Sequence, residues 1–117
     1  MNPIMREACG VQPLQKMQQR NPVNNATAAL NRLYKTMVRL GMDPNSPGTM
    51  GWIRAVDAAR SAGNWTGLNN LITHLENHPD SEFRELAPAW RQVVQAVQGV
   101  PANTPINVEA IWNGIRP

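Results

Sequence analysis

Apolar residues recur every three or four positions along most of the chain after residue 25. This spacing places their side chains on one face of an α-helix, which has 3.6 residues per turn. The first such stretch covers residues 26–40 and stops at Gly41, a residue that suits a helix C-terminus. Its apolar positions are Leu30, Leu33, Tyr34, Met37 and Leu40. The pattern predicts an amphipathic helix over residues 26–40.

A second helix is expected after Ser46 and Pro47, because serine caps helix N-termini and proline is tolerated in the first turn. Its apolar face holds Trp52, Ile53, Val56 and Ala59. Gly63 and Asn64 then interrupt the pattern and suit the turn of a helical hairpin, with Asn64 able to cap a third helix. That third stripe ends at His78, which precedes a proline. Its members are Trp65, Leu68, Leu71, Ile72 and Leu75.

The longest apolar stripe follows Asp80, whose carboxylate can cap a helix N-terminus. The stripe consists of Phe83, Leu86, Trp90, Val93, Val94 and Val97. Pro88 lies inside it and removes one backbone hydrogen bond, so we expect either a kink near Glu85 or a helix that begins close to Ala87. A short fifth helix is expected after Asn107, with Val108, Ile111, Trp112 and Ile115 on its apolar face.

No alternating run of β-branched residues predicts a strand. The fold class is therefore all-α, a compact bundle of four to five short helices, packed either orthogonally or up and down. Four tryptophans, one for each helix after the first, are expected to meet in its core. Residues 1–25 contain three prolines and few apolar anchors, which indicates a flexible polar N-terminal arm, and residues 26–117 form the bundle domain.

Composition narrows the classes of protein that this chain could belong to. Its apolar runs are far shorter than the roughly 20 residues of a membrane span, and its first residues do not resemble a secretory signal, so a cytoplasmic protein is expected. The single cysteine, Cys9, cannot form an internal disulfide. The net charge of +3 divides into +5 through residue 39 and −2 from residue 40.

The basic N-terminal third contains the candidate partner-binding residues. Arg32, Lys35 and Arg39 share the polar side of the first helix, and Lys16 and Arg20 add charge in the arm. Such a row could contact phosphates, which makes nucleic acid a candidate partner, although no aromatic residues are interleaved to stack on bases. A row of this length is most often a solvated helix face.

Catalytic and metal chemistry find little support in the sequence. His74 and His78 stand one helical turn apart, but a zinc ion needs at least a third protein ligand and no metalloprotease motif is present. No nucleophile stands beside a base with an orienting third group. We therefore expect no catalytic residues, no metal site and no cofactor.

A protein partner is the main expectation, and the chain is interpreted as a non-enzymatic interaction or assembly module. Uncharged amides occupy many polar positions of the helices, among them Asn69, Asn70, Gln92, Gln95 and Gln98. Small residues at Ala28, Ala29, Ala58 and Ala62 would let helices approach closely. The arm and the proline-containing residues 100–105 are interpreted as flexible connectors that become ordered on the partner. Nucleic-acid binding through the basic helix is the alternative.

Overall fold

The structure is a computed structural model that describes residues 21–116. Five α-helices make up this part of the chain, as the apolar periodicity predicts, and none of these residues forms a strand. The helices are α2 (Pro22–Arg39), α3 (Pro47–Ala62), α4 (Thr66–Glu76), α5 (Ser81–Gln98) and α6 (Val108–Ile115). The expected all-α bundle is confirmed.

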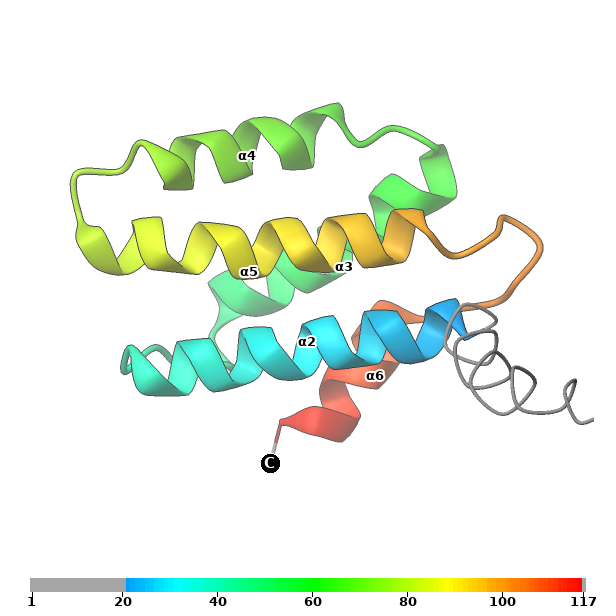
Figure 1. The fold of residues 1–117 in the computed structure, drawn as a ribbon, viewed down its shortest axis with the longest axis horizontal. Coiled ribbons are helices and arrows are strands. Elements are labelled where there is room, and N and C mark those ends of the chain that lie inside the picture. The colour runs from blue at the N-terminus through cyan, green and yellow to red at the C-terminus, as the bar shows by residue number, and fades with distance from the viewer. Residues whose placement is uncertain (1–20, 117) are drawn as a thin grey trace, which may run out of the picture.

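Three helices lie side by side in one layer, with α5 between α4 and α2, and both neighbours run antiparallel to α5 (Figure 1). Helix α3 crosses behind α5, and α6 packs behind α2 against α3. The most extensive packing is that of α2 against α5. Because α5 contacts α2, α3 and α4, its apolar stripe becomes the centre of the core.

Helix α2 begins at Pro22, four residues before the expected start. Proline at the first helical position loses no hydrogen bond, since that N–H has no partner within the helix. The first turn carries the exposed Asn24 and Asn25, and the first buried residue is Ala26. Apolar periodicity could therefore not reveal this turn. Residues 1–20 of the expected arm lie outside the described residues.

Most helix ends follow the expected capping chemistry. At the start of α4, Asn64 Oδ1 accepts the Thr66 N–H at 3.1 Å, but the N-cap residue is Trp65, one position later than expected. At the end of α2, Gly41 has a φ of +78° and the Met42 N–H donates to the Met37 carbonyl at 2.8 Å. This 6→1 bond after a left-handed glycine is a Schellman motif. The Ser46 hydroxyl accepts the Thr49 N–H at the start of α3, and Asn107 accepts the Ala110 N–H at the start of α6.

Helix α5 begins at Ser81, so of the two alternatives expected from Pro88, a helix start close to Ala87 is wrong. The Asp80 carboxylate accepts the Glu82 N–H and caps the helix. Pro88 lies inside the helix on its exposed side. Water can therefore hydrate the Arg84 carbonyl, which loses its helical donor, and this lowers the cost of the proline.

The four tryptophans belong to one core, but they do not form a single cluster. The rings of Trp52 and Trp90 pack with centroids 4.8 Å apart. Trp112 is fully buried and meets Tyr34 edge to face at 6.2 Å. Trp65 is partly buried against the core at the start of α4.

Candidate functional site

The basic row on α2 is partly engaged by α5. Arg32 Nε donates to the Gln92 side chain at 2.9 Å, and Arg39 Nη1 forms an ion pair with Glu85 at 3.2 Å. Lys35 lies exposed between the two arginines. A phosphate would have to compete with these contacts for the two guanidinium groups. Lys16 and Arg20, the other two residues of the predicted site, lie outside the described residues.

The two histidines have different surroundings. His78 Nδ1 accepts the Asp80 backbone N–H at 3.0 Å, and its ring packs on Phe83 with centroids 4.6 Å apart. His74 is exposed in the last turn of α4. Within residues 21–116, no three His, Cys, Asp or Glu side chains gather where they could hold a metal ion.

Residues 100–105 do not form the expected free connector. Val100 is buried, and Arg60 of α3 donates to the Pro101 and Thr104 carbonyls at 2.9 and 2.8 Å. The segment is thereby attached to the C-terminal part of α3. Sequence periodicity identifies Arg60 only as a polar position, and it does not reveal that a guanidinium group binds two carbonyl oxygens more than 40 residues away.

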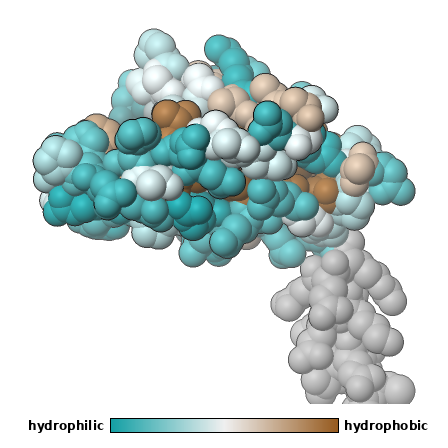
Figure 2. Space-filling model, turned by 90° about the horizontal axis from the view of Figure 1, so that it is seen from above, coloured by the Kyte–Doolittle hydropathy of each residue, from teal (hydrophilic) through white to brown (hydrophobic). Residues whose placement is uncertain are grey.

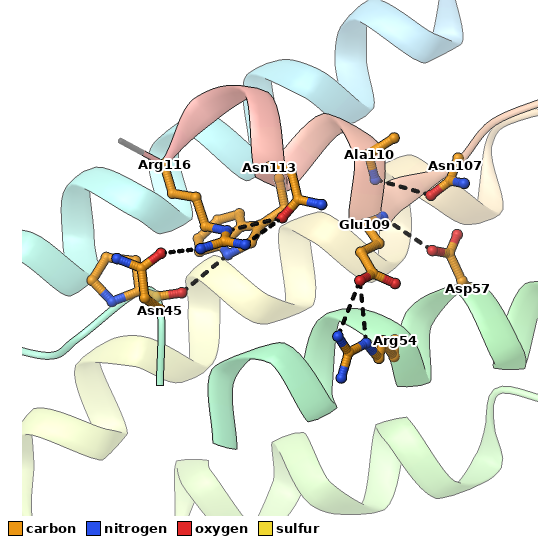
Figure 3. A network of polar contacts seen from close by, with 10 residues as sticks. Asn45, Arg54, Asp57, Asn107, Glu109, Ala110, Asn113 and Arg116 are labelled. Carbon is orange, nitrogen blue, oxygen red and sulfur yellow. Dashed lines mark hydrogen bonds and ion pairs between the residues drawn. The ribbon is translucent and has the colours of Figure 1, made fainter. Parts of the chain in front are cut away.

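Polar contacts also fix α6 against the rest of the bundle (Figure 3). Both oxygens of Asp57 accept backbone N–H groups of the first turn of α6, from Val108 at 2.9 Å and Glu109 at 3.0 Å. Arg54 pairs with Glu109 at 3.2 Å. At the other end of α6, the Trp112 indole N–H donates to the Pro44 carbonyl at 3.1 Å. These charged and polar residues stabilise the fold.

A partly open apolar pocket lies where α2, α3, α4 and α5 meet. We call it the Trp52 pocket. Its volume is about 250 Å³. Its apolar wall is formed by Met37, Met42, Trp52, Leu75, Phe83, Leu86 and Trp90, and its polar edge by Asp43, Ser46, Gly48 and Thr49.

Four apolar side chains of the Trp52 pocket are only partly buried, those of Met42, Trp52, Leu75 and Phe83. Trp90 is 2% exposed, and its ring packs against the ring of Trp52. The pocket therefore combines a buried aromatic side chain, that of Trp90, with an accessible rim of partly exposed apolar side chains. Sequence periodicity identifies most of these residues as core. It does not show that their helices leave a space where they meet.

A second, more open apolar surface lies between α3 and α4. It is lined by Ala55, Ala58, Ala59, Ala62, Asn64, Gly67, Leu68 and Leu71. Of the four small residues expected to allow close helix packing, only Ala29 is buried, whereas Ala58 and Ala62 line this surface. Viewed from the α4 side, the molecule is mostly hydrophilic with small hydrophobic patches (Figure 2).

The fold and the Trp52 pocket together define a helical bundle with a partly open apolar pocket between its helices. No family model matches this chain, and no curated protein or solved structure does either. Among the described residues, no helix combines the length and the apolar character needed to cross a membrane.

Proposed function

We propose that this chain is a non-enzymatic interaction module that binds another protein through the Trp52 pocket. The observation that carries the proposal is the composition of the pocket's accessible rim, where Met42, Trp52 and Phe83 are partly exposed together with Leu75. Aromatic and methionine side chains are enriched in the buried centres of protein interfaces. Tryptophan in particular is frequent among the few residues that contribute most of the binding energy.

The polar groups of the pocket support binding over catalysis. The Ser46 hydroxyl donates to Thr49 Oγ1 at 3.0 Å, and the Thr49 hydroxyl donates to the Asp43 carbonyl at 3.1 Å. A nucleophilic hydroxyl instead requires an adjacent base to take its proton. Both hydroxyl groups thus hold the start of α3 in place.

The proposal is tested by blocking the pocket without removing any of its walls. A side chain at Gly48 would find open space, since its nearest neighbour would be Ser46 Oγ at 4.0 Å from the new Cβ. Gly48→Leu should therefore fold normally and obstruct the mouth of the pocket. We expect this variant to recover the native partner from host extract at least tenfold less efficiently than the unmodified protein, a loss of about 1.4 kcal/mol.

Two matched glycine variants serve as controls. Gly51→Leu places the same side chain in α3 outside the pocket, and Gly67→Leu obstructs the surface between α3 and α4. Both should retain partner recovery and a helical circular dichroism spectrum. Equal recovery by all variants, or loss with Gly67→Leu alone, would contradict the proposal.

Nucleic-acid binding through α2 is the alternative proposal. The exposure of the basic row supports it, because Arg39 retains 62% side-chain exposure although it pairs with Glu85. Exposed pairs of this kind are weak, at about 0–1 kcal/mol, so a phosphate could displace the carboxylate. The row lacks an aromatic platform, and it offers three cations from α2.

A further inference from the structure

We infer that the Trp52 pocket binds one large apolar side chain of the partner that stands next to a lysine or arginine. This inference rests on the proposed function and adds the chemistry of the bound segment. Its basis is the hydrogen-bonding capacity and charge of the residues around the pocket.

The size of the pocket limits what it can hold. Pockets for drug-sized ligands usually have volumes of about 300–1,000 Å³. The Trp52 pocket, at about 250 Å³, is smaller than this range. It therefore suits a single anchor side chain inserted from a partner surface, the arrangement common at the centre of protein interfaces.

The polar edge of the pocket offers acceptors to a ligand. The hydroxyl protons of Ser46 and Thr49 are both donated within the α3 cap. Asp43 is exposed and is the only charged residue of the lining. One of its carboxylate oxygens accepts the Asn45 N–H at 2.8 Å, and the other accepts no hydrogen bond from a described residue. A bound segment that satisfies Asp43 must bring a donor, and a cation is the best one.

The segments that flank the pocket are also negatively charged. Residues 39–43 and 76–91 contain five carboxylates and three arginines, a net charge of −2. Arg39 and Arg91 already form ion pairs with Glu85 and Glu76. The remaining arginine, Arg84, donates to the His78 and Pro79 carbonyls at 2.6 and 2.9 Å.

Within these two segments, the carboxylates without an ion pair to a described residue are Asp43, Asp80 and Glu82. Charge complementarity across an interface speeds association and disfavours partners of like charge. A basic residue of the partner beside the apolar anchor would be attracted by these carboxylates, whereas an acidic residue would be repelled by them.

A random peptide library displayed on phage and selected against the full chain tests this inference. We expect enriched peptides to contain a large apolar residue within three positions of lysine or arginine, and to lose binding to Gly48→Leu. Against Asp43→Asn, these peptides should bind about two- to fivefold more weakly, as expected for an exposed ion pair. The amide oxygen of asparagine can still accept the Asn45 N–H, so the turn is preserved.

A second peptide, in which alanine replaces the basic residue, completes a double-mutant cycle. This peptide should bind the unmodified protein and Asp43→Asn with equal affinity. Two outcomes distinguish this inference from the proposed function. Peptides that are blocked by Gly48→Leu but carry no basic preference would overturn the inference and leave the proposed function standing. Selection that yields no peptide sensitive to Gly48→Leu would overturn both.

Discussion

Asp57 illustrates how one side chain can position an element that follows it by about 50 residues. Its two carboxylate oxygens accept the Val108 and Glu109 N–H groups, which have no acceptor within their own helix. The negative charge also lies at the positive end of the α6 dipole. A short helix of eight residues is marginal alone, so this contact helps to stabilise it.

Replacing Asp57 with alanine should therefore destabilise α6 first. We expect Asp57→Ala to lower the free energy of unfolding by about 1–2 kcal/mol, in the range measured for lost helix caps. Hydrogen exchange at the Val108 and Glu109 amides should accelerate. Asp57→Asn keeps one acceptor oxygen and should lose less stability. Unchanged exchange at both amides in Asp57→Ala would show that the cap does not hold the helix.

Individual residues also show where sequence reasoning succeeds. Gly41, Ser46 and Asn107 are predicted helix ends, and each makes the expected backbone or capping hydrogen bond. Such signals depend on a few neighbouring residues, so they can be read from the sequence. Asp57 and Arg60 bond with residues more than 40 positions away, and no local pattern encodes those contacts.

At the scale of helices, α2 carries the basic row that was predicted as the partner-binding site. Its outward face holds Lys35, while Arg32 and Arg39 reach α5. In the proposed function, the partner binds at the Trp52 pocket, which lies close to carboxylates and whose lining includes no residue of the basic row. The row is then a solvated face with contacts to its neighbour.

Binding to a random DNA duplex distinguishes these two roles of α2. We expect no detectable binding at 150 mM salt, and unchanged partner recovery when Arg32, Lys35 and Arg39 are all changed to glutamine. If the row contacts three phosphates, the logarithm of the binding constant should fall with the logarithm of salt concentration with a slope of about −3. Tight binding with such a slope, abolished by the triple variant, would favour nucleic acid instead.

At the scale of the whole molecule, the number and type of helices follow from the sequence, because each stripe can leave water only by packing against another. The Trp52 pocket does not follow in the same way. Trp52 and Trp90 are predicted core residues. The same apolar periodicity would be expected if their helices packed without leaving a pocket between them. Gly48 has no side chain, and Met42 lies in a turn outside any stripe. Their placement depends on how α2, α3 and α5 cross.

The central claim is that the Trp52 pocket accepts an apolar group from solution, and an NMR titration with indole tests it most directly. In ¹⁵N-labelled protein, indole should produce saturable shifts at the backbone amides of Gly48, Thr49 and Trp52. The same shifts should be absent in Gly48→Leu and present in Gly51→Leu. Saturable shifts at Ala58, Ala62 and Gly67 instead, or none at the pocket residues, would contradict the account.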